Sequence, residues 1–398
     1  MRTPVLLVAG QGARNDVVDL LIRTPGTLAV GYATDGHVVI RNVTEMRGER
    51  RIISQWPIEL AGGCVTCTIR NDLLILLRRL HRREDVARIV VELMDWIDPE
   101  PICTAINEVP VAVGPGYIDG PASRDVVISA VLTTIDCSHW LTQALGDEDL
   151  DGSRTVAQVV VGQAAFADVL VLTEPESTTC AVLRRLTPRS RITVGMDQVE
   201  TALANLDPQA RRGFGDDPHD SLLAGQPPLQ PAGEVTLVEF NARRPFHPDR
   251  LHQAIDDLLD GVIRVRGRAW LASQPDAVVW IESAGGGLGV GDAGRWLAAM
   301  SESERAYVDP ERIAMAAPGW DEKFGDRHIA LTALVCGAPP EVITGALNRA
   351  LLTDAEMADP ASWAAYPDPF GEWHSDPCTE LTDEVSVTDE HRSRKGEA

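Results

Sequence analysis

No apolar run in this chain is long enough to cross a bilayer, because the apolar residues 4–9 are followed at once by polar ones. Cysteine is scarce: seven residues, an odd number scattered over 398 positions, argue against a disulfide framework. Positive charge is also short, since 36 Lys and Arg against 59 Asp and Glu leave a net charge of -23. Such a surface repels nucleic acid over most of its area. These absences predict a cytoplasmic protein without a membrane span and with at most local nucleic-acid binding.

The length of the chain favours two domains over a single hydrophobic core. A stretch rich in Pro and Gly, which ends at Gly233, is the predicted linker between them. We therefore predict an N-terminal domain at 1–206, a linker at 207–233 and a C-terminal domain at 234–378. The residues after Cys378 are polar and charged without apolar periodicity, so we predict a disordered tail at 379–398.

Two cysteines lie three positions apart on a glycine-rich turn that precedes a predicted helix. Cys64 and Cys67 follow two glycines, and leucines recur at spacings of three and four from Leu73 to Leu80. Thiols at a helix N-terminus gain from the unpaired N–H groups and from the positive end of the dipole, which favours the thiolate. The spacing favours metal binding, with redox chemistry and an inert pair in a structural turn as the alternatives.

The segment from Pro4 to Asp16 predicts a buried strand, a glycine turn and a helix start, which is where a phosphate loop is expected. A phosphate loop needs Gly-x-x-x-x-Gly-Lys-Ser/Thr: the backbone N–H groups cradle phosphates, the lysine reaches the β and γ oxygens, and the hydroxyl holds magnesium. Here Arg14, Asn15 and Asp16 follow the glycine turn, and Asp16 would repel a phosphate. Arg14 is a poor replacement for lysine, because a planar fork does not fit where a compact ammonium does. The architecture is predicted to persist without the phosphate chemistry.

The run that contains the two cysteines resembles the hallmark of the CobW family of metal-linked P-loop GTPases, Gly-Cys-x-Cys-Cys-Thr-x-Arg-x-Asp-Leu. Cys64 and Cys67 match the outer cysteines, and Thr66 stands where the middle one belongs. Further matches follow in order at 240–251, 261–272, 325–328 and 368–373. The resemblance implies an α/β fold: a P-loop GTPase-like parallel sheet domain with degenerate nucleotide motifs, followed by a smaller α+β CobW C-terminal domain.

The other nucleotide motifs of the family are also altered here. Residues 89–99 resemble its acidic strand, with Glu92 in place and Asp95 where a glycine belongs. The strand at 163–172 should lead into the guanine-reading Asn-Lys-x-Asp motif, but the next four residues are Thr-Glu-Pro-Glu, and only Glu176 keeps the acidic end. The resemblance thus implies a pseudo-GTPase to which we assign no catalytic and no nucleotide-binding residue, and for which GTP is not an expected cofactor.

Zinc is the cofactor that the resemblance implies, with Cys64 and Cys67 as thiolate ligands. A closed zinc site takes four tetrahedral ligands, so further ligands must come from elsewhere or from water. Glu59, just upstream, is the candidate third ligand, and the alternative is a solvated loop carboxylate. Two other pairs could complete a zinc site: Cys137 with His139, and His374 with Cys378. The alternative is that they are ordinary buried cysteines and exposed histidines, which are commoner than metal ligands.

A basic cluster follows at the C-terminal end of the predicted helix. It comprises Arg78, Arg79, Arg82 and Arg83. Cations favour a helix C-terminus and solvate its exposed face, which is one explanation. The other is a docking surface for a phosphate backbone or an acidic protein, and these four arginines are our predicted partner-binding residues.

The combination of an altered phosphate loop with a Cys-x-x-Cys motif is similar to the pattern of CobW members that bring a hibernation factor to ribosomes when zinc is scarce. The resemblance implies a zinc-responsive, non-hydrolysing adaptor whose partner is the ribosome or a ribosome-associated hibernation factor of the protein Y type. The alternative function is a GTP-dependent zinc metallochaperone of the ordinary CobW kind. Magnesium-dependent GTP binding distinguishes the two.

Overall fold

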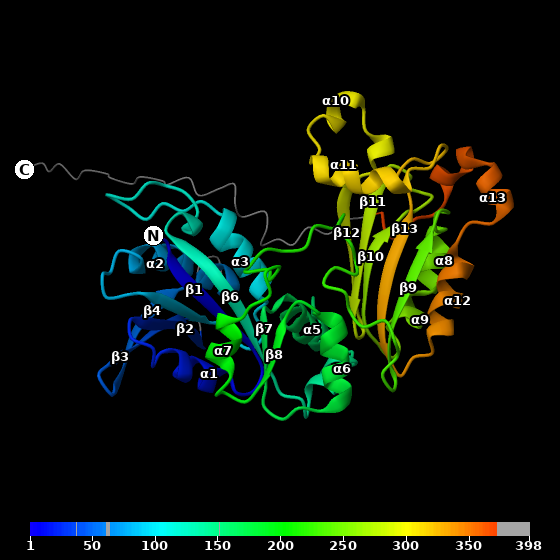
Figure 1. Cartoon of the computed structure of the whole chain (residues 1–398). Coiled ribbons are helices and arrows are strands. Elements are labelled where there is room, and N and C mark those ends of the chain that lie inside the picture. Colours follow the sequence, from blue (N-terminus) through cyan, green and yellow to red (C-terminus); the bar gives the residue numbers. More distant parts are fainter. Residues whose placement is uncertain (37, 61–63, 151, 372–398) are drawn as a thin grey trace, which may run out of the picture.

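The structure is a computed structural model that describes residues 1–36, 38–60, 64–150 and 152–371. The predicted tail at 379–398, together with His374 and Cys378, lies outside these residues. The described residues form two sheets, each with its own helices, joined by the segment 207–233 (Figure 1). Among the described helices, none is both long and apolar enough to cross a membrane.

Within the described residues, the first sheet has eight strands in the order β4-β3-β2-β5-β1-β6-β7-β8. They are β1 (Thr3–Gly10), β2 (Thr27–Asp35), β3 (Val38–Arg47), β4 (Arg50–Glu59), β5 (Arg88–Glu92), β6 (Val126–Ile135), β7 (Val169–Leu172) and β8 (Arg191–Val194). Six of them, from β2 to β8 in the sheet order, run parallel. β3 and β4 extend the sheet by antiparallel pairing. This is the predicted P-loop GTPase-like sheet.

Helices cover both faces of the first sheet, as a parallel sheet requires. They are α1 (Arg14–Leu21), α2 (Val65–Leu80), α3 (Pro99–Glu108), α4 (Trp140–Ala144), α5 (Val156–Phe166), α6 (Ser177–Leu186) and α7 (Val199–Ala204), with the 3-10 helix η1 (Ala122–Arg124). Leu6 and Val8 of β1 pack with α1 and α7 on one face. Val5 and Leu7 pack with α2 and α3 on the other. Burial on both faces explains why β1 is apolar at nearly every position.

The second sheet is smaller and antiparallel, with the strand order β12-β11-β10-β13-β9. Its strands are β9 (Val235–Ala242), β10 (Val262–Ala269), β11 (Ala277–Ala284), β12 (Gly287–Arg295) and β13 (Ile329–Cys336). Its helices are α8 (Pro248–Gln253), α9 (Ile255–Leu259), α10 (Glu302–Arg305), α11 (Pro310–Ala316), α12 (Pro340–Ala350) and α13 (Asp354–Ala358), with η2 (Leu297–Ala299), η3 (Ala317–Gly319) and η4 (Pro360–Ala365). α8, α9 and α12 lie on the sheet face that points away from the first domain (Figure 1).

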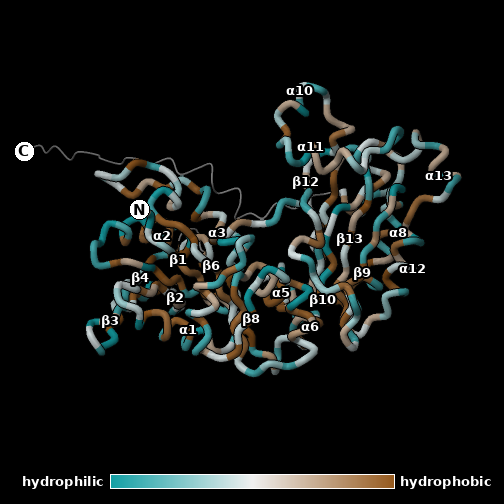
Figure 2. Tube along the Cα trace, in the orientation of Figure 1, coloured by the Kyte–Doolittle hydropathy of each residue, from teal (hydrophilic) through white to brown (hydrophobic). Residues whose placement is uncertain are grey.

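The two domains share a hydrophobic core. Leu172 and Val182 of the first domain belong to the same buried cluster as Val235 and Leu334 of the second. Figure 2 shows hydrophobic segments running into this junction from β7, α5 and α6. The β11–β12 turn also docks closely, because a Cβ at Gly285 would lie 2.3 Å from a carbonyl oxygen of the first domain. The domains are therefore packed against each other rather than merely tethered.

Candidate functional site

The carboxyl ends of β1, β5 and β6 meet at one edge of the first sheet, where parallel α/β sheets hold their ligands. β1 ends at Gly10, and α1 begins only four residues later. Gly10 has a φ of 98°, and a Cβ there would lie 2.2 Å from the Thr134 carbonyl oxygen of β6, so a side chain does not fit. The turn from β1 into α1 occupies the place of a phosphate loop.

The Arg14 guanidinium fills this turn. Its Nη1 donates to the carbonyl oxygen of Gly10 at 3.1 Å, and its Nε donates to Oε1 of Glu92 at 3.2 Å. The same guanidinium forms an ion pair with Asp95, so two carboxylates from the end of β5 and the loop after it hold one arginine. Only 15% of the Arg14 side chain is exposed. The turn is occupied by a side chain of the protein itself.

The residues that would bind phosphate and magnesium are replaced. Counting the phosphate-loop spacing from Gly10 places Asn15 at the second glycine, Asp16 at the lysine and Val17 at the hydroxyl. Asp16 is exposed at the first turn of α1, while Val17 is buried in the core. A carboxylate repels a phosphate at that position, and a valine cannot ligate magnesium. The turn follows the backbone path of a phosphate loop, but it lacks the lysine that contacts phosphate and the hydroxyl that ligates magnesium.

Glu176, the acidic end of the altered guanine-reading motif, has a helix-capping role in the structure. It is the N-cap of α6, and its carboxylate accepts from the amides of Thr178 at 2.9 Å and Thr179 at 2.7 Å. These backbone hydrogen bonds lower the pKa of Glu176 to about 2. The carboxylate is therefore committed to capping a helix, a local role that the sequence motif did not indicate.

A polar cavity of about 270 Å³ lies beside the Arg14 turn, between α1 and the β3–β4 hairpin. Arg14 and Glu92 line one side of it, while Asn42 and Gln55 line the other. The Gln55 side chain donates to Oδ1 of Asn42 at 2.8 Å, across the two strands. Sequence reasoning missed these amides, because alternating polar residues on a hairpin look the same whether they face solvent or a cavity.

Cys64 caps α2, as the glycine-rich turn before a helix predicted. Its Sγ accepts from the amide of Cys67 at 3.2 Å, and its carbonyl oxygen accepts from the Thr68 hydroxyl at 2.8 Å. Cys67 is 4% exposed, while Cys64 is half-buried. Both sulfurs thus lie in the first turn of the helix, where the dipole favours thiolates.

Glu59 does not join the two cysteines. It ends β4, the outermost strand of the sheet, and it is exposed. Among the described residues, no group of three or more His, Cys, Asp or Glu side chains is arranged to hold a metal ion. The structure thus shows no preformed Glu59, Cys64 and Cys67 cluster among the described residues, and zinc binding by this set stays a prediction.

Asp72, on the helix that begins at the cysteines, has a structural role in holding α2. Asp72 accepts from the Tyr32 hydroxyl at 2.9 Å and from Nη1 of Arg41 at 2.8 Å. These partners come from β2 and β3, so the carboxylate fastens the helix that carries the cysteines to the sheet. Arg41 also lies over the Trp56 ring of β4, with its guanidinium carbon 5.0 Å from the ring centre.

The four arginines predicted to bind a partner differ in burial. Arg78 is 2% exposed and belongs to the core of the domain. Its guanidinium pairs with Asp125 at 2.7 Å and donates to the carbonyl oxygens of Ile118 at 2.7 Å and Gly120 at 3.1 Å. A side chain with this many internal partners cannot reach a docking protein, so Arg78 positions the segment 111–125 against α2.

The other three arginines reach the surface to different degrees. Arg79 and Arg82 are exposed, and the Arg82 guanidinium lies 3.6 Å from the centre of the Tyr117 ring. Arg83 is partly exposed and pairs with Glu45 at 3.0 Å and Asp85 at 2.6 Å. Two neighbouring carboxylates cancel much of its charge. Arg79 and Arg82 are thus the cations of this cluster that a partner can contact.

A parallel sheet with a glycine turn between β1 and α1, and with an acidic β5 end, defines a P-loop GTPase-like domain. Residues 32–191 match the CobW/HypB/UreG nucleotide-binding domain, and residues 235–351 match the cobalamin synthesis protein cobW C-terminal domain. The Arg14 turn lies outside the first matched range. The chain belongs to the CobW family.

Two relatives show the range of similarity. The chain is 58% identical over 393 residues to "Zinc chaperone Rv0106" of Mycobacterium tuberculosis, with 99% of each chain covered. It is 25% identical to "Zinc-regulated GTPase metalloprotein activator 1" of Dictyostelium discoideum, with 75% of this chain and 67% of the relative covered. Among solved structures, Zn(II)-bound YjiA GTPase from E. coli aligns with a TM-score of 0.40 and 15% identity, over 88% of this chain and 99% of that one.

Proposed function

We propose that this CobW-family protein is a zinc-linked adaptor that works without hydrolysing GTP. The observation that carries the proposal is the Arg14 turn. A bound phosphate would have to displace the guanidinium from Glu92 and Asp95, and it would then face two carboxylates and Asp16 without a lysine. Separating a partly buried ion pair is costly, because it leaves a charge without its partner. Phosphate is therefore disfavoured twice, by the lost pair and by the exposed negative charge.

Zinc is the proposed cofactor, with Cys64 and Cys67 as thiolate ligands. The position of both sulfurs in the first turn of α2 supports this assignment, and so do the relatives, two of which carry zinc in their names. Thiolate ligands bind zinc at about 2.3 Å, and two of them with water or a partner's side chain can fill four positions. A ligand supplied by the partner would make zinc part of the docking interface.

The proposed partner is the ribosome or a ribosome-associated hibernation factor of the protein Y type, recruited when zinc is limiting. The resemblance of the altered motifs to such CobW members supports this choice. The exposed Arg79 and Arg82 add a local positive surface to a chain of net charge -23, which suits a phosphate backbone or an acidic protein.

A GTP-dependent zinc metallochaperone is the second candidate function. It is favoured by the 58% identity over nearly the whole chain to a protein whose name is zinc chaperone. Under this function the protein would bind GTP with magnesium and pass zinc to a client. Arg14 would then have to leave the turn when nucleotide enters.

Calorimetry on the full chain separates the two functions. Titration with magnesium and GTP, in the presence and absence of zinc, should give no binding tighter than about millimolar if the adaptor proposal is right. Micromolar binding that requires magnesium would contradict it and favour the metallochaperone. Titration with zinc alone should show binding that is lost in a Cys64→Ser/Cys67→Ser variant.

A further inference from the structure

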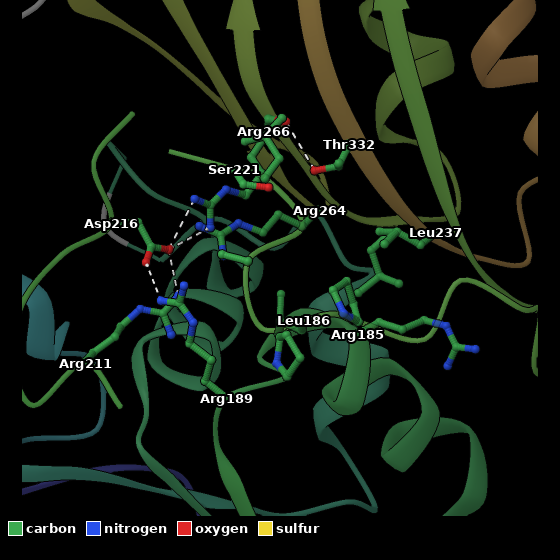
Figure 3. A pocket seen from close by; sticks show the side chains of 15 residues that line it. Arg185, Leu186, Arg189, Arg211, Asp216, Ser221, Leu237, Arg264, Arg266 and Thr332 are labelled. Atoms are coloured by element: carbon green, nitrogen blue, oxygen red, sulfur yellow. Dashed lines mark hydrogen bonds and ion pairs between the residues drawn. The ribbon is translucent and has the colours of Figure 1, made fainter. Parts of the chain in front are cut away.

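Five arginine side chains line a cavity at the junction of the two domains, far along the chain from the Arg14 turn. The guanidinium groups of four of them gather around Asp216, and that of the fifth, Arg185, points away (Figure 3). Figure 3 shows the cavity with its lining side chains. The first domain supplies Arg185 from α6 and Arg189 from the loop after it, segment 207–233 supplies Arg211, and β10 supplies Arg264 and Arg266. Such a concentration of one charge is unexpected in a chain whose net charge is -23.

Asp216 supplies a carboxylate to the lining, and three arginines share it. Its oxygens lie 2.7 Å from Nη2 of Arg211, 3.3 Å from Nη2 of Arg266 and 3.7 Å from Nη1 of Arg189. Figure 3 shows its carboxylate between the guanidinium groups of the two domains. Arg264 has a separate partner, the Glu282 carboxylate of β11. Within the lining, Asp216 is thus the counter-charge to five arginines, while Glu100 and Asp220 lie close enough to interact with Arg211, Arg264 and Arg189.

Arg185 is a buried arginine of the lining that has no carboxylate partner among the described residues. The side chain is buried, with 7% of the residue exposed, and its terminal nitrogens donate to the carbonyl oxygens of Ala181 and Gln230. No carboxylate of the described residues pairs with it, and its buried Nε has no hydrogen-bond acceptor there. The Nε atoms of Arg189, Arg264 and Arg266 lack acceptors in the same way. A buried cation without a counter-charge is costly, and an anion in the cavity would offset that cost.

The cavity has the size and the walls for a small anion. Its volume is about 50 Å³, and between the arginines it is lined by Leu186, Leu237 and Leu334. Apolar walls strengthen an ion pair, because they keep water and its screening away. The arginine fork presents parallel N–H donors that match the oxygens of a phosphate group.

We propose that this cavity is an oxyanion site that binds a phosphate group between the two domains. The bound group would take hydrogen bonds from Arg189 of the first domain and from Arg264 and Arg266 of the second. It would therefore hold the domains in their observed arrangement and raise the stability of the whole chain by mass action. The site is separate from the Arg14 turn and does not depend on the proposed function.

Calorimetry with inorganic phosphate tests the site, with chloride at equal ionic strength as the control anion. We expect saturable binding to the full chain that Arg189→Ala weakens at least about tenfold, because a charged hydrogen bond is lost. Arg184→Ala is the matched control: it removes the same charge from the exposed neighbour of Arg185 on α6 and should leave the affinity unchanged. Arg189 is partly exposed, so its loss should not prevent folding.

A second variant gives a change of opposite sign. Asp216→Asn removes the carboxylate that competes for Arg211 and Arg266, so phosphate should bind more tightly to it than to the natural chain. A parallel titration with GMP tests whether the site also accepts a phosphate group that belongs to a larger molecule. If the protein binds inorganic phosphate but not GMP, the site is assigned to the free anion. If it binds both, the site is assigned to a phosphate ester.

Two results would overturn the proposal. One is the absence of phosphate binding at 10 mM, roughly the weakest affinity of interest, in both the natural chain and Asp216→Asn. The other is phosphate binding that survives Arg189→Ala but disappears in Arg14→Ala, which would place the anion at the turn between β1 and α1. In either case the arginines would be an ion network that only joins the domains.

Discussion

The Nε of Arg14 donates to the Glu92 carboxylate across 3.2 Å, from the first residue of α1 to the last residue of β5. In a working phosphate-loop enzyme the backbone of this turn cradles phosphate, and the acidic strand end helps to hold magnesium. Here a cation and an anion of the protein satisfy each other, and Asp95 adds a second negative charge. The turn therefore holds an ion-pair network made by the protein's own side chains.

Removing Arg14 should not create a nucleotide site. Arg14→Ala releases Glu92 and Asp95 but adds neither the lysine nor the magnesium hydroxyl. We expect affinity for magnesium and GTP to stay weaker than about millimolar, as in the natural chain, measured by calorimetry. Micromolar binding by the variant would show that Arg14 is a gate over a functional site.

The zinc affinity should depend on Cys64 and Cys67 and on pH. The thiols must lose protons to bind, so zinc binding should release protons and weaken as the pH falls. Cys64→Ser/Cys67→Ser should abolish it, measured by calorimetry against a chelator. Cys180→Ser is the control, because Cys180 is a half-buried thiol on α6 rather than at the α2 N-terminus. Unchanged stoichiometry in the double variant would place the metal elsewhere.

Arg78 and Arg79 are neighbours whose removal should affect stability to very different degrees. Arg78→Ala leaves Asp125 and several carbonyl oxygens without their donor, so we expect a loss of about 3 kcal/mol in the free energy of unfolding. Arg79→Ala removes an exposed side chain and should change it by less than about 0.5 kcal/mol. Urea denaturation followed by circular dichroism measures both. Equal losses would contradict the division of the cluster by burial.

Association with ribosomes should depend on the exposed pair and on zinc. Arg79→Ala/Arg82→Ala should weaken cosedimentation and flatten its salt dependence, because fewer charges are exchanged. The cysteines lie about 20 Å away along α2, at 1.5 Å per residue, so zinc could bias this surface through the helix. Sucrose gradients with zinc added or chelated provide the measurement. A protein that stays in the soluble fraction in every condition would contradict the adaptor proposal.

The Asp216 carboxylate should stabilise the protein in a pH-dependent way. Burial alone would raise the pKa of Asp216, but Arg211 and Arg266 outweigh burial and lower it to about 2 from 3.8. A folded pKa below the unfolded one contributes stability above about pH 4, which is lost as the pH falls towards 2. Asp216→Asn should therefore cost about 2 kcal/mol at pH 7 and progressively less at pH 4 and pH 3, by urea denaturation. A difference that does not shrink below pH 4 would contradict this origin.

Local patterns were enough for the elements and for the class of the fold. The apolar run of β1, the glycine turn and the leucine spacing of α2 each depend on residues close in sequence, and each appears as predicted. The altered phosphate loop was visible for the same reason, because its motif is a fixed spacing of residue types within one segment.

Side-chain placement depended on contacts between distant segments. Arg78 and Arg79 are indistinguishable in sequence, yet helix rotation buries one against residues 111–125 and exposes the other. Glu59 lies five residues from Cys64, but an edge strand turns it to solvent.

By itself the sequence determined the two-domain plan, the buried strands and the loss of the phosphate-loop lysine, because these follow from composition and short-range spacing. Only the tertiary structure decided that Arg14 meets Glu92, that Asp216 lies between arginines of both domains, and that Arg185 has no carboxylate beside it among the described residues. Charge pairing is set by distances of a few ångströms between residues tens of positions apart, and packing of the sheets and helices fixes those distances.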